Sequence, residues 1–241
     1  MVVRWPEMPA LSVVIPTLNE AQSLPLLLGD LALLSVPFET VVSDGGSTDG
    51  TPEIAASHGA DVLRSATGRG AQLAAGADAA SGTILCFLHA DCRLDGAARA
   101  ALVRAVSVIG DHEALAFTLR IDGKGWRYRF VEWGTDQRSR WMGIPYGDQG
   151  LLLTRRTYHR AGGFLALPLM EDVALVRVLR RQGVVRILPE QVVVSARRWR
   201  RDGVLRRTLR NWWLLTAYLA GVSPRTLATA YQPEPSTPGA P

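Results

Sequence analysis

The sequence predicts an α/β protein with a mainly parallel central sheet that helices cover on both faces. In the first 110 residues, apolar β-rich runs of about five residues alternate with helix-like stretches of about ten to fifteen, which is the spacing of strand–helix–strand units. Hydrophobic residues make up 47% of the 241 residues and charged residues 20%, which excludes disordered and fibrous proteins. A chain of this length can bury a full core.

The first half supplies four strands and four helices in alternating order. Pro16 ends the first strand, and Asn19 is placed to cap the helix that follows. Thr48 or Asp49 is placed to cap a short second helix with Pro52 in its first turn. We expect strands at 11–15, 39–43, 61–64 and 84–88, and the longer helices at 19–34, 70–80 and 95–108.

The second half departs from this alternation. We expect strands at 114–121, 147–154, 184–188 and 191–195, and helices at 126–141, 170–182 and 203–220. The polar, proline-rich residues 231–241 are predicted to be disordered, and residues 1–10 to form an amino-terminal extension. No repeat or linker divides the chain into independent domains.

Ligands of parallel α/β sheets bind beyond the carboxyl ends of the strands. This rule points to four segments, at 16–20, 44–49, 64–70 and 89–91. The first strand-to-helix turn, PTLNE, contains no glycine, and the chain has no G-x-x-x-x-G-K-[ST] loop. Dinucleotide-dependent enzymes and P-loop NTPases are therefore not expected.

The fourth strand ends in FLHADC, where His89 and Asp91 lie two residues apart. On a strand, this spacing points both side chains the same way. An acid there can hold a divalent cation, which in turn neutralises a diphosphate. The alternative is that Asp91 only caps the next turn.

Two further acidic segments each carry a functional and a structural interpretation. In SDGGSTDGT, Asp44 can accept hydrogen bonds from a base or ribose, beside Gly45 and Gly46, which permit close approach and positive φ. The segment is equally typical of a tight turn with a helix cap. Glu171 and Asp172 begin a helix, where the macrodipole alone favours acids; a carboxylate that faces a cleft there can also act as a general base.

These segments resemble family 2 glycosyltransferases with the GT-A fold. SVVIPTLNE, SDGGSTDGT, FLHADC, the GGF turn at 162–164 and MEDVAL occur in that family's order across about residues 10–230. The closest resemblance is to small bacterial transferases with an FLHAD signature, described as radical-SAM/selenodomain-associated transferases. It implies one continuous GT-A domain at 11–230, with a nucleotide-sugar-binding half at 11–110 and an acceptor-binding half at 111–230.

The resemblance implies roles for individual residues in an inverting glycosyltransferase. Asp172 matches the general base, with Glu171 beside it, and Asp91 matches the metal ligand of the D-x-D motif. The residues implied to line the nucleotide-sugar pocket are Pro16, Thr17, Asn19, Glu20, Asp44, Gly45, Arg69, His89 and Arg198. Glu20 is expected near the ribose or base, and Asp44 at the base.

One position departs from the family pattern. His89 replaces the first acid of D-x-D, which removes a negative charge from the expected metal site. A neutral imidazole binds Mn²⁺ more readily than Mg²⁺. The cofactor is therefore expected to be a divalent cation, Mn²⁺ or Mg²⁺, with His89 and Asp91 as its protein ligands.

The formal net charge of +5 is concentrated in one segment. Residues 195–210 contain seven arginines and one acid, which leaves −1 on the rest of the chain. We call this set the arginine belt: Arg197, Arg198, Arg200, Arg201, Arg206, Arg207 and Arg210. Two interpretations stay open, contact of Arg197 or Arg198 with the nucleotide diphosphate and a solvated basic face.

The helix at 203–220 places arginines ahead of Trp212, Trp213, Leu214 and Leu215. This order suits a helix in an anionic membrane interface. The competing interpretation, which we favour, is that its apolar side packs on the protein body or in a homodimer.

Composition limits the compartment and the partners. Two cysteines give no disulfide framework, the first residues lack a signal-peptide core, and the longest apolar run, 212–222, is about half a membrane span. We expect a cytoplasmic protein, peripheral at most to the inner face of the membrane. The expected partners are a nucleotide-diphosphate sugar and a hydroxyl acceptor, metabolite or lipid, and no nucleic acid. The expected acceptor lining is Trp126, Trp133, Trp141, Tyr146, Asp148 and Gln149.

Two rival functions are weaker. A nucleotidyltransferase needs a glycine-rich basic loop after its first strand, and PTLNE has none. A nucleic-acid-binding module would use the arginine belt, but that belt is one short segment on an otherwise slightly acidic chain.

Overall fold

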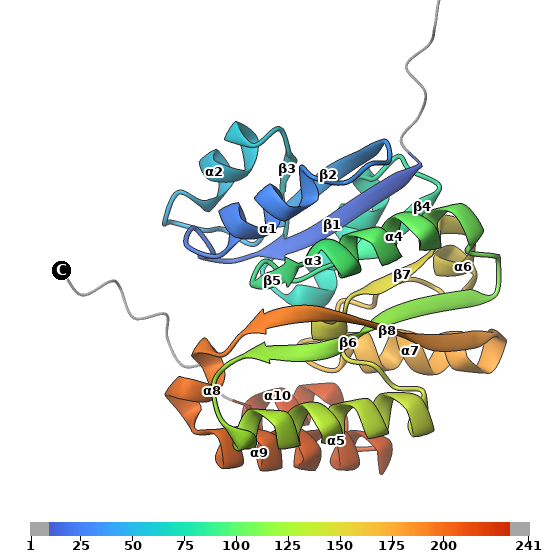
Figure 1. Cartoon of the computed structure of the whole chain (residues 1–241). Helices are drawn as coiled ribbons and strands as arrows, with labels where there is room; N and C mark the ends of the chain where they lie inside the picture. Colours follow the sequence, from blue (N-terminus) through green and yellow to red (C-terminus); the bar gives the residue numbers. More distant parts are fainter. Residues whose placement is uncertain (1–9, 232–241) are drawn as a thin grey trace, which may run out of the picture.

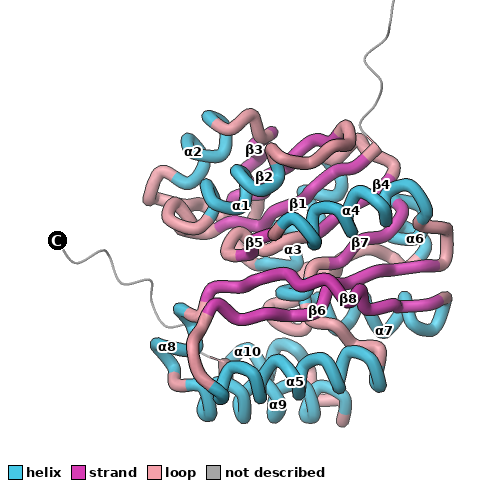
Figure 2. The backbone as a smooth tube through the Cα atoms, viewed as in Figure 1, coloured by secondary structure: helices cyan, strands magenta, loops and turns pink. Residues whose placement is uncertain are grey.

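A computed structural model describes residues 10–231 of the chain. Its centre is one eight-stranded sheet with the strand order β3-β2-β1-β4-β7-β6-β8-β5. Helices lie on both faces of this sheet, and α5, α9 and α10 form a further layer below the β6–β8 part in Figure 1. Figure 2 shows the strands running between these helical layers. The predicted α/β class is therefore confirmed.

The amino-terminal half alternates strands and helices as the apolar runs predict. The side chains of β1 are buried along the whole strand, because helices cover it on both faces. The elements are β1 (Leu11–Thr17), α1 (Leu24–Leu31), β2 (Phe38–Asp44), α2 (Thr51–Ser57), β3 (Asp61–Arg64), α3 (Arg69–Ala79), β4 (Ile84–Phe87), β5 (Cys92–Leu94) and α4 (Gly96–Val108). Strands β1 to β4 are mutually parallel.

Two boundaries in this half were predicted wrongly. Pro16 does not end the first strand: β1 continues to Thr17, with Pro16 paired in register opposite Ser43. The first helix begins at Leu24 and not after Asn19. The fourth helix is as predicted, with the Asp95 carboxylate accepting from the Ala98 amide.

The carboxy-terminal half completes the sheet with both strand directions. Strand β7 runs antiparallel to β4 and β6, β8 runs parallel to β6, and β5 returns antiparallel to β8. Four of the seven pairings are parallel, so the sheet is mainly but not wholly parallel. The elements are β6 (Glu113–Asp122), α5 (Trp126–Met142), η1 (Gly147–Gln149), β7 (Leu151–Thr154), α6 (Arg155–Arg160), α7 (Glu171–Gln182), β8 (Val184–Ser195), α8 (Arg197–Asp202), α9 (Val204–Leu219) and α10 (Pro224–Ala230).

The two short strands predicted at 184–188 and 191–195 form one strand. Strand β8 runs from Val184 to Ser195, with a register shift where Phe117 and Thr118 pair with Leu188 and Gln191. The break at Pro189 is thus absorbed as an irregularity within one strand. The predicted extension and tail lie outside the described residues, except for Ala10 and Tyr231.

Three apolar clusters hold these layers together. One packs α1, α4 and Trp199 against one face of the sheet, and a second packs α3, α6 and α7 against the other. The third joins α9 and α10 to the start of α7, through Leu214, Leu215, Leu227 and Val173. The third cluster fixes α9 beside the loops that carry the site.

The contact between α3 and β1 depends on a glycine. A Cβ at Gly76 would collide with the Val14 side chain, whereas a Cβ at Gly29 on α1 would meet nothing within 4 Å. We predict that Gly76→Ala lowers the free energy of unfolding by about 1–3 kcal/mol through overpacking. In urea unfolding, Gly29→Ala is the matched control and should leave stability unchanged or raise it by about 0.5–1 kcal/mol. Equal stability of the two variants would contradict this account of the packing.

Candidate active site

The parallel register brings four loops to one edge of the sheet. Thr17, at the end of β1, lies opposite Asp44, and Asp44 lies opposite Arg64. Strand β4 lies on the other side of β1 and ends at Phe87, which is opposite Val14. The segments that the strand-end rule selects from the sequence therefore lie together.

Asp44 organises the turn that follows β2. Its Oδ2 accepts from the amides of Gly46 and Ser47 at 2.8 Å each, and its Oδ1 accepts from the hydroxyls of Ser47 and Thr17. Burial alone would raise the pKa of this carboxyl, but the bonds from Ser47, Gly46 and Thr17 outweigh it and hold the pKa below its ordinary value. All four acceptor positions are occupied here. The contact of Asp44 with a nucleotide base stays a prediction. It requires that a hydrogen bond to the base replace one of these four bonds.

Gly45 gives room to a buried amide that sequence reasoning missed. Gln72 on α3 donates from Nε2 to the carbonyls of Thr17 at 2.6 Å and Ser43 at 3.0 Å. A Cβ at Gly45 would lie 3.0 Å from that same nitrogen. The glycine and the amide together tie the ends of β1 and β2 to α3. The only sign of this role in the sequence is that Gln72 is a single amide side chain in an alanine-rich helix.

Asn19 joins two loops and caps no helix. Its Oδ1 accepts from the Thr48 amide at 2.9 Å, and its own amide donates to the Ser47 hydroxyl at 2.8 Å. Its φ of 56° is left-handed, a region that asparagine tolerates better than most residues. The predicted helix cap is therefore wrong, because Asn19 bonds the neighbouring loop instead.

Two acids and two arginines form an ionic cluster at this edge. Glu20 contacts Arg197 directly and lies 4.0 Å from Arg198. Asp91 lies 3.6 Å from Arg197 and 3.8 Å from Arg198. The Glu20 and Asp91 side chains are only 11% and 7% exposed, so their charges need these partners. We call Glu20, Asp91, Arg197 and Arg198 the ionic cluster.

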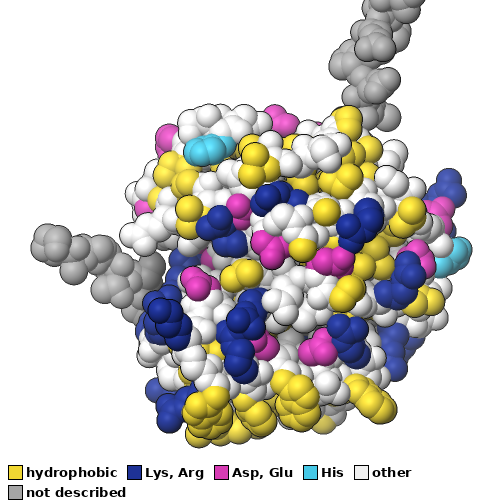
Figure 3. All heavy atoms as spheres, in the orientation of Figure 1, with side chains coloured by type: hydrophobic (Ala, Val, Ile, Leu, Met, Phe, Trp, Pro, Cys, Tyr) yellow, Lys and Arg dark blue, Asp and Glu magenta, His cyan; other side chains and the backbone are white. Residues whose placement is uncertain are grey.

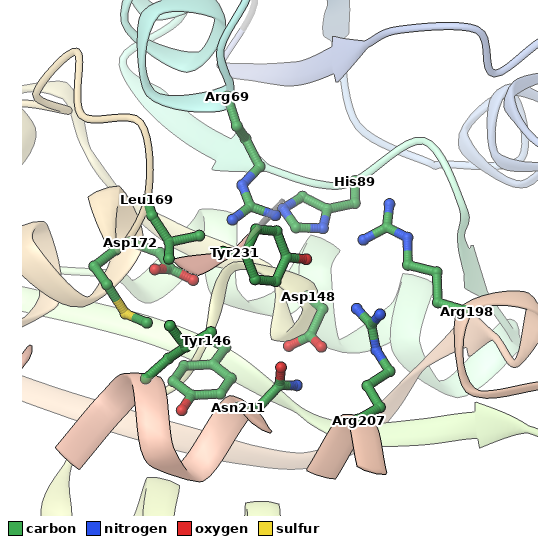
Figure 4. Close-up of a pocket in the computed structure, with 12 residues that line it drawn as sticks. Arg69, His89, Tyr146, Asp148, Leu169, Asp172, Arg198, Arg207, Asn211 and Tyr231 are labelled. Carbon is green, nitrogen blue, oxygen red and sulfur yellow. The ribbon is translucent and has the colours of Figure 1, made fainter. Parts of the chain in front are cut away.

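Two cavities meet at Arg198. The first has a volume of about 350 Å³ and is lined by Leu18, Asn19, Glu20, Arg197, Arg198 and Arg201. The second has about 100 Å³ and is lined by Arg69, His89, Tyr146, Asp148, Leu169, Met170, Asp172, Arg198, Arg207, Asn211, Leu214 and Tyr231. Figure 4 shows the guanidinium groups of Arg69, Arg198 and Arg207 directed toward this second cavity.

The sequence predicted that His89 lies on the fourth strand, but it lies in the turn after that strand. Strand β4 ends at Phe87, and the Cys92 amide closes the turn by donating to the His89 carbonyl at 3.0 Å. Burial lowers the pKa of the imidazole well below its ordinary value, and the guanidinium groups of Arg69 and Arg198 lower it further. Its Nε2 has no hydrogen-bond partner among residues 10–231. His89 therefore presents a neutral ring with an unpartnered nitrogen.

Asp172 faces the second cavity from the first turn of α7. Its Oδ2 accepts from the Gly147 amide and its Oδ1 from the Val173 amide, at 2.7 Å each. These two amides fix the orientation of the carboxylate and leave each oxygen one acceptor position. The geometry suits a group that takes a proton from a bound hydroxyl.

Glu171 is directed elsewhere, although it is adjacent to Asp172. Its side chain is 1% exposed and pairs with Arg69 on α3, and Glu171 does not line the second cavity. Burial raises the pKa of Glu171, against the opposing effect of Arg69. The preceding residue, Met170, has a left-handed φ of 65°. Neighbouring residues of a helix point about 100° apart, so Glu171 holds Arg69 while Asp172 faces the cavity.

Two of the residues expected to line an acceptor site lie at the second cavity, and the other four do not. Tyr146 and Asp148 line the second cavity, and burial raises the pKa of Asp148, whose Oδ1 has no hydrogen-bond partner within the described chain. Gln149 is fully buried and bonded to Ser139 and the Phe117 carbonyl. The other three predicted lining residues, Trp126, Trp133 and Trp141, lie on the outer surface of α5 at 73%, 59% and 82% exposure.

Residues from α9 and the end of α10 complete the cavity and were not predicted. Arg207, Asn211 and Tyr231 all line it, and the Arg210 guanidinium lies 4.8 Å from the Tyr231 ring centroid. In Figure 4 the Tyr231 ring lies among Arg69, His89 and Asp148. No single-sequence pattern marks Tyr231, because it is brought there by the packing of α9 and α10.

The arginine belt is largely engaged within the protein. Asp202 accepts from Arg201 at 2.8 Å, Arg207 at 2.7 Å and Arg210 at 3.2 Å. The hydrogen bonds from Arg201 and Arg207 lower the pKa of Asp202 to about 2. Arg197, Arg207 and Arg210 are thus held in ion pairs, whereas Arg200, Arg201 and Arg206 are exposed, so the belt is a solvated basic face only in part.

The donor set around Asp91 can complete the coordination of a divalent cation but does not enclose one. The described residues contain no group of three His, Cys, Asp or Glu side chains that could hold a metal ion. One carboxylate, at Asp91, and one unpartnered imidazole nitrogen, at His89, suit a cation whose other ligands are phosphate oxygens and water. The residues fit a metal that arrives with a phosphorylated ligand.

Two curated relatives share part of the chain. A stretch of 113 residues is 40% identical to a PGL/p-HBAD biosynthesis glycosyltransferase of Mycobacterium bovis and covers 44% of this chain and 43% of that protein. A stretch of 87 residues is 39% identical to an uncharacterized glycosyltransferase of Mycobacterium tuberculosis and covers 36% and 38% of the two chains. The alignments thus span less than half the length of these relatives.

Solved structures share the fold over more of the chain. A mannosyltransferase from Pyrobaculum calidifontis in complex with GDP-Man and Mn²⁺ superposes with a TM-score of 0.63 at 21% identity, over 93% of this chain and 69% of that one. Glucosyl-3-phosphoglycerate synthase from Mycobacterium tuberculosis, with Mn²⁺, UDP and glucosyl-3-phosphoglycerate, gives 0.57 at 20% identity, over 77% and 71%. At these identities the likeness concerns the fold, which is GT-A.

The model of the family described as glycosyl transferase family 2 matches residues 12–168, well over half of the chain. The order of the strand-end loops and the cavities beyond them agree with that match. The chain therefore belongs to glycosyl transferase family 2.

Proposed function

We propose that this protein is an inverting glycosyltransferase that moves a sugar from a nucleotide-diphosphate sugar to a hydroxyl acceptor. One observation carries the proposal: Arg198 lines both the first cavity and the second. A guanidinium fork at that junction matches the position of a diphosphate that joins a nucleoside in one cavity to a sugar in the other.

The first cavity is the proposed nucleoside side. It is bounded by the Leu18–Glu20 loop and by Arg197 and Arg198 of the ionic cluster. The two solved relatives described above hold GDP-Man or UDP together with Mn²⁺, which supports a nucleotide-sugar donor here. Asp91 and His89 would hold the divalent cation, whose chemistry is to neutralise the diphosphate leaving group.

The second cavity is the proposed site of transfer. The acceptor oxygen forms a bond to the anomeric carbon while the bond from that carbon to the diphosphate oxygen breaks. The acceptor proton passes to the Asp172 carboxylate, and the electron pair of the broken bond leaves on the diphosphate. Arg69, which Glu171 holds in place, and Arg198 supply positive charge near that leaving group.

Arg198→Gln tests the donor side. We expect the Kd for UDP or GDP, measured calorimetrically with Mn²⁺ present, to rise about 10- to 100-fold, because a hydrogen-bonded charge contact of about 1.5–3 kcal/mol is lost. Arg206→Gln, an exposed member of the same belt, is the matched control and should bind as the parent does. Unchanged affinity of the Arg198 variant for both nucleotides would refute this assignment.

Asp172→Asn tests the base. The amide retains an oxygen for the Gly147 amide but cannot take a proton, so kcat for transfer or for hydrolysis of the donor should fall about 10²–10⁴-fold. Donor affinity should remain within the error of the parent protein. Asp61→Asn, an exposed acid at the start of β3, is the control for the same substitution. Turnover close to that of the control would exclude Asp172 as the base.

A further inference from the structure

Helix α5 presents an aromatic row to the outside. Trp126, Phe130, Trp133 and Trp141 recur at helical spacing on one side and are 73%, 62%, 59% and 82% exposed. The opposite side of the helix is already packed, with Thr135, Arg138 and Ser139 buried. The exposed row therefore contributes nothing to the core of the monomer.

Helix α9 repeats this arrangement beside α5. Its inward row packs through Leu214 and Leu215 in the third apolar cluster. Its outward row consists of Leu205, Leu209, Trp212 and Trp213, which are 71%, 59%, 41% and 54% exposed. The sequence left open whether the apolar residues of this helix pack on the protein or face outward. In the structure one side of the helix packs and the opposite side is exposed.

The two rows form one surface. Helices α5 and α9 contact each other and lie side by side in Figure 1, and Figure 3 shows hydrophobic side chains along the lower edge, over these helices. We call these eight residues the aromatic face: Trp126, Phe130, Trp133, Trp141, Leu205, Leu209, Trp212 and Trp213. Contiguous exposed apolar surface of this kind marks an interaction site.

The charge beside the aromatic face is positive. The two helices carry seven arginines and two acids, but Arg138 and Arg207 are buried on the sides that face the protein, and Arg210 pairs with Asp202. Both acids are already paired, Glu132 with Arg129 at 3.0 Å and Asp136 with Arg140 at 2.7 Å. Arg127 and Arg206 are exposed at the border of the face. In Figure 3 basic side chains border the hydrophobic edge.

We propose that the aromatic face docks the protein onto an anionic lipid bilayer. Tryptophan and phenylalanine favour the headgroup level of a membrane, and adjacent arginines bind lipid phosphates. None of the described helices has the length and apolarity needed to cross a bilayer.

This docking places the site of transfer near the lipid. The side of α9 opposite the aromatic face supplies Arg207, Asn211 and Leu214 to the second cavity. The cavity is therefore about one helix diameter, roughly 10 Å, from the bilayer surface. Resting on the proposed function, this favours an acceptor hydroxyl carried by a lipid, although binding itself does not depend on transfer.

Vesicle flotation of the full chain tests the docking. We expect the protein to float with vesicles of phosphatidylcholine and phosphatidylglycerol in equal parts, and far less with phosphatidylcholine alone. The variant W126S/W133S/W213S should bind on the order of 100-fold more weakly. L33S/V108S removes two exposed apolar side chains, at 67% and 73% exposure, on the α1 and α4 side of the sheet and should float as the parent does. Circular dichroism checks that both variants fold.

Three outcomes would overturn the proposal. The first is no flotation with the anionic vesicles, and the second is undiminished flotation of the triple variant. The third is a parent dimer, seen by light scattering and abolished in the triple variant, without vesicle binding, which would assign the face to a second copy of the chain. Loss of transfer in Asp172→Asn with flotation intact would separate this proposal from the catalytic one.

Discussion

The ionic cluster of Glu20, Asp91, Arg197 and Arg198 is the interaction on which the site depends. Its acids come from the loops after β1 and β4, whereas its arginines begin α8, more than a hundred residues later. Burying Glu20 and Asp91 without these partners would cost several kcal/mol per charge. The cluster therefore holds the carboxyl edge of the first half against the last third of the chain, and it sets Arg198 where the two cavities meet.

A second ion pair, between Arg69 and Glu171, positions an arginine at the second cavity. Arg69, in the first turn of α3, is held by Glu171, and Asp172, the next residue of α7 and therefore about 100° further around the helix, faces the cavity. Two adjacent acids thus have different tasks, one positioning a cation and the other facing the proposed acceptor. The third apolar cluster adds α9 and α10, whose side chains form the remaining wall.

The sequence predicts the strands and longer helices well because their apolar periodicity is local, as in β2 and α4. The prediction is wrong where a side chain can bond more than one backbone group. Asn19 could cap a helix, but its side chain accepts a hydrogen bond from the neighbouring loop instead. Strand direction in the second half and the three-residue β5 leave no periodic signal. Asp91 and Asp172 were predicted as site residues from motif order, whereas Gln72 and Tyr231 were not, because only tertiary packing brings them to this edge of the sheet.

The most direct test of the central claim, that Arg198 joins a nucleoside cavity to a transfer cavity, is a crystal structure with UDP or GDP and Mn²⁺. We expect the diphosphate within hydrogen-bond distance of the Arg198 guanidinium and the nucleoside beside the Leu18–Glu20 loop. The space in front of Asp172 should be left open for sugar and acceptor. A nucleotide that occupies the space before Asp172, or that binds away from Arg198, would contradict the claim.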